Sequence, residues 1–281
     1  MIDEEACLIS TLRIGDKIGS QTTAGTLGGF VKYYDYYECF LTCAHVMYDM
    51  QTLFGPSFNC SELNGPRAYC YIPNNEVECG KVIWGTFNHD EILETSVDAA
   101  LVMLQNDWKM DPNDYVIDLH GKSYPFPHLG LSTPYLNSSI LDHETLCDHQ
   151  VTTKVVGWGA ETQLQENVTF LKNSLSLLSL GQAAVSANGN TFDQLLMHTQ
   201  VHMQSTAGYL TDRRVFRMYN QIGIDLKLGS GDSGTCIYVV KLPNNKGCIG
   251  MVIGRCGSLA IVTPLKDIFK RMGIETTYNV Q

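Results

Sequence analysis

The sequence lacks a hydrophobic segment of membrane-spanning length. Its longest apolar run, residues 175–185, is interrupted by serine, glycine and glutamine and is shorter than the roughly 18 residues that cross a bilayer. The first five residues are acidic where a secretory signal would be basic, and no apolar core follows them. Positive charge is also scarce, because 19 Lys and Arg against 29 Asp and Glu give a net charge of −10. We therefore expect neither a membrane nor a nucleic acid as a partner.

Charged residues make up only 17% of the 281 residues, and hydrophobic residues make up 44%. This balance is typical of a globular protein, and it provides enough apolar side chains for one large core or two smaller ones. Residues 8–110 contain short apolar or alternating segments separated by turn residues, a pattern that favours an antiparallel barrel or sandwich. The segments are 25–31, 40–44, 68–72, 80–85 and 96–104.

The most informative stretch is the tetrapeptide Gly231-Asp232-Ser233-Gly234. Glycines on both sides let the backbone turn sharply and approach a substrate closely. Such a turn can hold Ser233 Oγ forward while the N–H groups of Gly231 and Ser233 point into one hollow, as an oxyanion hole requires. The same residue types also form ordinary turns, so the interpretation depends on finding a base and a group that orients it.

Candidates for both groups lie upstream of the tetrapeptide. His45 follows the apolar segment 40–44, and Asp98 opens the buried segment 96–104. A serine nucleophile needs a base that takes its proton and a carboxylate that fixes the tautomer of that base. His45 and Asp98 suit these two roles. Alternatively, His45 is a core histidine and Asp98 is an ordinary carboxylate at the end of a strand.

Taken in order, three motifs resemble those of the trypsin-like serine proteases. They are Thr42-Cys43-Ala44-His45, Asp98-Ala99-Ala100-Leu101 and Gly231-Asp232-Ser233-Gly234. Residues 155–159 resemble the motif that opens the second barrel of this family, and residues 250–254 and 261–265 resemble its last two strands. The resemblance covers residues 8–270. It implies an all-β chymotrypsin fold, with two six-stranded antiparallel barrels, an active site in the cleft between them and a short C-terminal helix.

The resemblance also implies a division of the chain and an activity. Residues 1–110 would form a barrel that carries His45 and Asp98, residues 111–150 a proline-rich linker, and residues 151–281 a barrel that carries Ser233. The expected function is a serine endopeptidase that works through a Ser-His-Asp triad and an acyl-enzyme, with a protein or peptide as substrate and no cofactor. The alternative is a protease-like binding module whose oxyanion loop is collapsed.

Two groups of residues have metal-ligand side chains without the spacing of a standard metal site. His143, Cys147 and His149 lie in the proposed linker with no second cluster to match them, so we expect a solvated loop there. His198 and His202 are four residues apart and would share one face of a helix, where a structural or exposed role is more common. The sequence therefore predicts no metal.

The ten cysteines could indicate a secreted disulfide framework. Secreted members of the family that the chain resembles carry one cysteine directly after the catalytic histidine and another four residues before the serine. This chain has Val46 and Gly229 at those positions. We therefore expect most of the thiols to be free, and the protein to be cytoplasmic or otherwise intracellular.

The resemblance leaves the activation of the enzyme open. Secreted members become active when cleavage frees an N-terminal amine that pairs with the aspartate before the nucleophile, which is Asp232 here. No matching N-terminal sequence lies at the required distance before His45. Asp232 therefore needs another partner: either the chain is constitutively competent, as in zymogen-free relatives, or an activating domain or partner orders its oxyanion loop.

Specificity rests on three positions that the resemblance assigns to the substrate pocket. The position at the base of the primary pocket, six residues before the nucleophile, is Lys227 here, while Arg255 falls on the pocket wall and Gly257 lies just beyond it. Two cations would favour an acidic side chain before the scissile bond. Alternatively, loop lengths differ from those of the family and Lys227 points to solvent.

Overall fold

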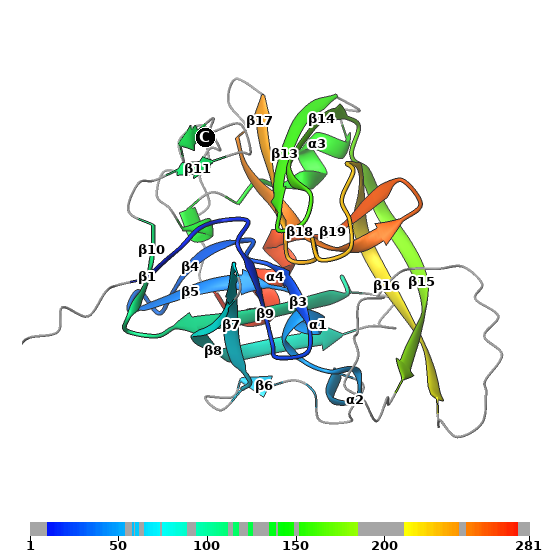
Figure 1. The fold of residues 1–281 in the computed structure, drawn as a ribbon. Coiled ribbons are helices and arrows are strands. Elements are labelled where there is room, and N and C mark those ends of the chain that lie inside the picture. Colours follow the sequence, from blue (N-terminus) through cyan, green and yellow to red (C-terminus); the bar gives the residue numbers. More distant parts are fainter. Residues whose placement is uncertain are drawn as a thin grey trace, which may run out of the picture.

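The structure, a computed structural model, is dominated by two curled antiparallel sheets, one from each half of the chain (Figure 1). It describes residues 10–53, 58, 60–61, 65–73, 75–88, 94–111, 115–117, 123–125, 135–138, 140–148, 152–184, 211–241 and 246–274. The all-β class predicted from the sequence is confirmed. No helix in this described part of the chain is long and apolar enough to cross a membrane.

The first sheet, barrel one, closes through a bent strand. Its order is β3-β2-β7-β8-β9-β5-β4, so β3 and β4 lie at opposite edges although only Leu27 and Gly28 separate them in the chain. The Leu27 N–H donates to the Asp16 carbonyl on one side, and the Gly28 N–H donates to the Leu41 carbonyl on the other, so hydrogen bonding continues across the bend. When β3 and β4 are counted as one bent strand, the barrel has six strands. The strands are β2 (Lys17–Gly19), β3 (Ala24–Thr26), β4 (Gly29–Tyr33), β5 (Tyr37–Thr42), β7 (Arg67–Ile72), β8 (Asn75–Asn88) and β9 (Val97–Leu104), with the short β6 (Cys60–Ser61) beside β8.

The second sheet, barrel two, closes in the same way. Its order is β14-β13-β17-β18-β19-β16-β15, and only Phe170 and Leu171 separate β14 from β15, which lie at opposite edges. Six strands again result when β14 and β15 are counted as one. The elements are β13 (Thr153–Gly159), β14 (Gln163–Thr169), β15 (Lys172–Ala184), β16 (Thr211–Asp225), β17 (Cys236–Lys241), β18 (Gly247–Cys256), β19 (Leu259–Pro264) and the C-terminal helix α4 (Leu265–Met272).

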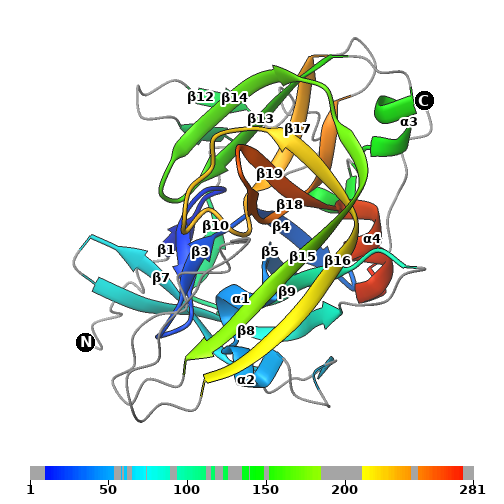
Figure 2. The ribbon, with the colours of Figure 1, turned by 90° about the vertical axis from the view of Figure 1, so that its right-hand side faces the viewer.

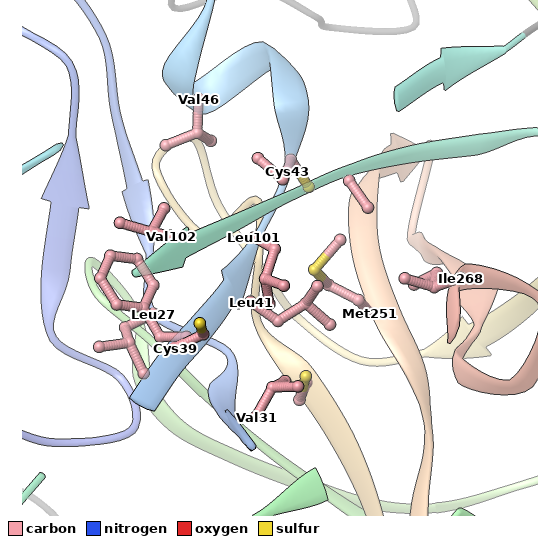
Figure 3. Close-up of a cluster of buried hydrophobic side chains, with 14 of the residues drawn as sticks. Leu27, Val31, Cys39, Leu41, Cys43, Val46, Leu101, Val102, Met251 and Ile268 are labelled. Atoms are coloured by element: carbon pink, nitrogen blue, oxygen red, sulfur yellow. The ribbon is translucent and has the colours of Figure 1, made fainter. Parts of the chain in front are cut away.

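Helix α4 and a shared apolar cluster hold the barrels together. The helix buries Leu265, Ile268, Phe269 and Met272, the spacing of one helix face, and it packs against β8 and β9 as well as β18 and β19. Figure 3 shows Ile268 and Met251 of the second half beside side chains of barrel one such as Leu101. Each fully buried aliphatic side chain contributes about 1.5–3 kcal/mol. The barrels are therefore joined by a continuous core.

A long hairpin of barrel two reaches barrel one. Strands β15 and β16 run together toward the short helices α1 (Ala44–Met47) and α2 (Met50–Leu53) of barrel one (Figure 2). The Ser96 N–H donates to the Tyr219 carbonyl at 3.1 Å, and the Tyr219 N–H donates to Ser96 Oγ at 3.0 Å. The Gln221 side chain also donates to the Ser96 carbonyl at 2.9 Å. The hairpin therefore supports the start of β9.

The segment predicted to be a linker, residues 111–150, contains regular structure in its described parts. Just before it, strand β10 (Trp108–Met110) pairs in parallel with β1 (Ser10–Leu12), and within it β11 (Tyr115–Ile117) pairs with β12 (Ser123–Pro125). A 3₁₀ turn, η2 (Leu136–Ser138), and helix α3 (His143–Asp148) follow. The expectation of a solvated loop is wrong for His143, which is only 4% exposed and has its pKa lowered, first by burial. The Cys147 side chain, His149, His198 and His202 lie outside the described residues.

Candidate active site

His45 and Asp98 meet inside barrel one. Strand β5 ends at Thr42, so His45 lies on helix α1 just after the strand, and Asp98 is the second residue of β9, the strand that pairs with β5. His45 Nδ1 and Asp98 Oδ2 are 2.5 Å apart, and the His45 backbone N–H donates to Asp98 Oδ1 at 3.1 Å. Asp98 is fully buried and His45 is 6% exposed. Both carboxylate oxygens therefore have a partner on His45, which holds the imidazole in one orientation.

Cys43 lies beside this pair but has the wrong properties for a metal ligand. One ligand atom from each of Cys43, His45 and Asp98 falls within 4.8 Å of the others, and these residue types do bind zinc. A cysteine must be deprotonated to a thiolate to bind zinc. Burial, followed by the Asp98 charge, raises the pKa of Cys43 well above its usual value, and the thiol donates to the Val252 carbonyl at 3.2 Å. These properties disfavour metal binding.

The loop that carries Ser233 connects β16 to β17 and depends on two glycines. Gly231 has φ of +88° and Gly234 has φ of +100°, a region in which side chains other than glycine are strained. A Cβ at Gly234 would also lie 2.3 Å from the Thr26 carbonyl oxygen. The sequence argument for glycine on both sides of Ser233 therefore has a structural basis.

Barrel one contacts this loop next to His45. The Thr26 N–H donates to the Ser233 carbonyl at 2.8 Å. A Cβ at Gly25 would lie 2.7 Å from the Ser233 carbonyl oxygen and 2.4 Å from Val46 Cγ2, so Ser233 and the residue after His45 are close neighbours. Within the described residues no hydrogen bond links His45 Nε2 to Ser233 Oγ. That contact of the triad stays a prediction, since catalytic hydrogen bonds are often long in unliganded structures.

The two predicted oxyanion donors have no partner in the part of the chain that the structure describes. Among the described residues, the N–H groups of Gly231 and Ser233 have no acceptor, whereas the neighbouring Gly234 N–H donates to the Val252 carbonyl at 2.9 Å. Gly231 and Ser233 therefore retain two backbone donors for a ligand. An oxyanion hole uses N–H groups that are free in this way.

Asp232 has the partner that the sequence could not identify. Its carboxylate is fully buried and accepts four hydrogen bonds. Oδ1 accepts from the N–H groups of Glu161 and Thr162 at 3.0 and 3.2 Å. Oδ2 accepts from the Thr162 hydroxyl at 2.6 Å and from the Gly229 N–H at 2.7 Å. The turn between β13 and β14 thus contacts Asp232 with backbone and hydroxyl donors. Sequence reasoning missed Glu161 and Thr162 because they belong to no motif, although they closely follow Gly159.

The three predicted pocket residues lie at one end of barrel two. The end of β16 pairs with the start of β19, which pairs in turn with the end of β18. Lys227 follows β16 by two residues, Arg255 is the penultimate residue of β18, and Gly257 begins the turn into β19 with φ of +60°. All three are exposed. The fold brings them to the same end of three neighbouring strands, and their roles stay a prediction.

A hollow of about 530 Å³ lies where the two barrels meet near the β13–β14 turn. Its lining includes Asp16, Lys17 and Tyr71 from barrel one and Trp158 and Ala160 from barrel two. Lys17 Nζ lies 2.5 Å from Oε1 of Glu161, the residue after Ala160, so an ion pair joins the two barrels beside the hollow. The pKa of Asp16 is raised from 3.8 to about 6, chiefly because burial disfavours the charged form.

Comparisons with known proteins establish the fold. No protein-family model and no curated protein matches the chain. Thermobifida fusca Protease A is similar in structure, with 12% identity, a TM-score of 0.53 and coverage of 94% of this chain and 97% of that one. Nocardiopsis protease has 12% identity, a TM-score of 0.51 and coverage of 93% and 96%. A glutamic acid specific serine protease, described as using a histidine triad in substrate binding, has 13% identity, a TM-score of 0.51 and coverage of 92% and 97%. The chain therefore has the chymotrypsin fold of trypsin-like serine proteases.

Proposed function

We propose that the protein is a serine endopeptidase with Ser233 as nucleophile, His45 as general base and Asp98 as the group that orients it. The observation that carries the proposal is the buried 2.5 Å contact between His45 and Asp98, next to the loop that holds Ser233. A buried carboxylate on Nδ1 leaves Nε2 as the basic nitrogen, which is the state a general base requires.

Each residue then has a defined role in the proposed reaction. Ser233 Oγ attacks the peptide carbonyl while His45 Nε2 takes its proton, and Asp98 stabilises the imidazolium that results. The N–H groups of Gly231 and Ser233 donate to the oxyanion of the tetrahedral intermediate. His45 returns the proton to the leaving amine, which yields an acyl-enzyme. Water activated by His45 then hydrolyses the ester and frees Ser233.

Two observations favour the protease over a binding module with a collapsed oxyanion loop. The N–H groups of Gly231 and Ser233 have no acceptor among the described residues, so they are available to an oxyanion. Asp232 already has four donors, and it therefore has no need of an activating amine. We accordingly propose a chain that is competent without cleavage and without an activating partner.

The proposed substrate preference is for Glu or Asp before the scissile bond. Lys227 and Arg255 place two cations at one end of barrel two, where an acidic side chain would gain a charge-assisted hydrogen bond. A glutamic acid specific serine protease is among the structures of similar fold. Its histidine triad belongs to that protein, so the preference proposed here depends on different side chains.

We also propose the chain division stated above, with barrels in residues 1–110 and 151–281, and an intracellular location. The seven cysteines whose state the structure describes are all free, which supports a reducing compartment. They are Cys39, Cys43, Cys70, Cys79, Cys236, Cys248 and Cys256.

An active-site fluorophosphonate tests the activity directly. The wild-type protein should be labelled once, on Ser233, and should cleave a peptide library. Ser233→Ala should abolish labelling and lower kcat by about 10⁶-fold. Ser230→Ala is a matched control, because it removes an exposed serine from the same loop, and it should be labelled at the wild-type rate. A correctly folded wild-type protein that resists the probe would refute the proposed function.

A further inference from the structure

Thr26 of barrel one holds the nucleophile loop of barrel two at two points. Its backbone N–H donates to the Ser233 carbonyl at 2.8 Å, and its hydroxyl donates to the Gly231 carbonyl at 3.0 Å. Thr26 is fully buried. The loop therefore lies directly against Thr26, with one anchor on each side of Asp232.

The same hydroxyl also contacts the turn that holds Asp232. It accepts a hydrogen bond from the Ala160 N–H at 2.9 Å, and the next two residues after Ala160 are donors to the Asp232 carboxylate. On the other side, the Thr42 hydroxyl donates to the Thr26 carbonyl at 2.9 Å and fixes Thr26 within barrel one. The Thr26 hydroxyl is thus the point at which barrel one, the β13–β14 turn and the nucleophile loop meet.

These contacts restrict the backbone next to the oxyanion donors. Gly231 has φ of +88°, and because glycine adopts both signs of φ readily, its own backbone does not select one orientation. A peptide unit is planar, so holding the Gly231 carbonyl fixes the unit that joins Gly231 to Asp232. The Asp232 carbonyl accepts from the Thr235 N–H and hydroxyl at 3.1 and 2.7 Å, which fixes the unit that carries the Ser233 N–H.

We infer that Thr26 is a positioning residue for the oxyanion hole: its hydroxyl and its N–H hold the carbonyls of Gly231 and Ser233, and so keep in place the two residues whose N–H groups form the hole. The inference rests on the proposed function and deepens it, since it names a residue outside the triad on which that site depends. Thr26 acts through Gly231 and Ser233, and it is not a catalytic residue itself.

Two substitutions separate the hydroxyl from the shape of the side chain. Thr26→Val removes the hydroxyl and keeps a branched side chain, whereas Thr26→Ser keeps the hydroxyl. Because oxyanion donors act in the transition state, Thr26→Val should lower kcat with little change in KM. Loss of a whole donor lowers kcat by about 100- to 1000-fold, and we expect a misdirected one to lower it by about 10- to 100-fold. The kcat of Thr26→Ser should stay within about threefold of the wild-type value, because the hydroxyl is retained.

Thr169→Val is the matched control, because it too removes a largely buried hydroxyl. That hydroxyl belongs to barrel two and donates to the neutral Phe170 carbonyl at 3.1 Å. Its kcat should equal that of the wild type once corrected for the folded fraction measured by circular dichroism. If Thr26→Val loses activity only in proportion to its folded fraction, or if Thr26→Ser fails to restore kcat, the positioning role is overturned.

Amide hydrogen exchange of residues 229–235 tests the inference without relying on catalysis. Exchange in this segment should be faster in Thr26→Val, and near the wild-type rate in Thr26→Ser and Thr169→Val. This pattern in a wild-type protein that resists the fluorophosphonate would refute the protease and still support Thr26 as the anchor of the loop. Unchanged exchange in Thr26→Val would overturn the inference whatever the activity of the protein.

Discussion

Replacing Thr162 with valine should loosen the nucleophile loop by a predictable amount. Thr162 Oγ1 donates to Asp232 Oδ2 at 2.6 Å, and Asp232 is fully buried. A hydrogen bond to a charged group contributes about 1.5–3 kcal/mol net. We therefore expect the free energy of unfolding to fall by that amount, which lowers Tm by about 3–12 °C for a chain of this size.

The activity of Thr162→Val should fall further than its stability alone explains. If the lost energy specifically destabilises the competent loop, the rate of fluorophosphonate labelling should drop by about 10- to 100-fold, since 1.36 kcal/mol corresponds to a factor of ten. Thr169→Val, on the same hairpin, removes a hydrogen bond to a neutral carbonyl and should cost about 0.5–1.5 kcal/mol with labelling unchanged. Equal Tm shifts and equal labelling rates for the two variants would refute the assigned role of Thr162.

Three further predictions concern specificity, pH and the thiols. Lys227→Ala should lower kcat/KM for substrates with Glu before the scissile bond by about 10- to 100-fold, from the energy of a charge-assisted hydrogen bond; an unchanged cleavage profile would place Lys227 outside the pocket. The pKa of Asp16 in the folded protein, about 6, exceeds its ordinary value of 3.8, so its stabilising contribution is complete below about pH 4 and is lost as the pH rises through about 6. Thermal unfolding of Asp16→Asn should lack this loss, and identical pH slopes for the two proteins would contradict the assignment. In thiol titration of the native protein Cys256 should react before the other six cysteines of described state, because it is exposed and they are buried; denaturation without reductant should release at least those six more.

The parts of the site that the sequence predicted are those with a local pattern. Gly231 and Gly234 flank Ser233 because the backbone there needs positive φ. An apolar segment precedes His45 because that residue follows the buried strand β5, and apolar residues surround Asp98 because it lies in the buried strand β9. Such requirements act within a few residues, so they are visible in a single sequence.

The parts that the sequence could not predict are contacts between distant positions. The Thr26 hydroxyl and the Gly231 carbonyl are 205 residues apart, and the Thr162 hydroxyl and Asp232 are 70 apart. No spacing rule links such pairs, and Thr is a common strand and turn residue in its own right. The misinterpretation of His143 has the same origin, because its proline-rich surroundings resemble a solvated loop while tertiary packing buries its side chain.

The chemistry of the groups that hold Asp232 predicts the alkaline side of the pH profile. All four donors are backbone amides or a hydroxyl, and none of them titrates near neutral pH. An N-terminal amine, by contrast, has an ordinary pKa of about 8 and loses its charge as the pH rises.

If Asp232 depends on neutral donors, kcat/KM should stay level from about pH 8 to pH 10, and acetylation of the N-terminal amine should leave the labelling rate unchanged. Lys17→Gln, which removes a surface ion pair with Glu161, should not alter the profile, because such a pair contributes about 0–1 kcal/mol. A decline in activity near pH 8 that acetylation reproduces at pH 7 would show that an amine, and not the β13–β14 turn, holds the loop in its competent form.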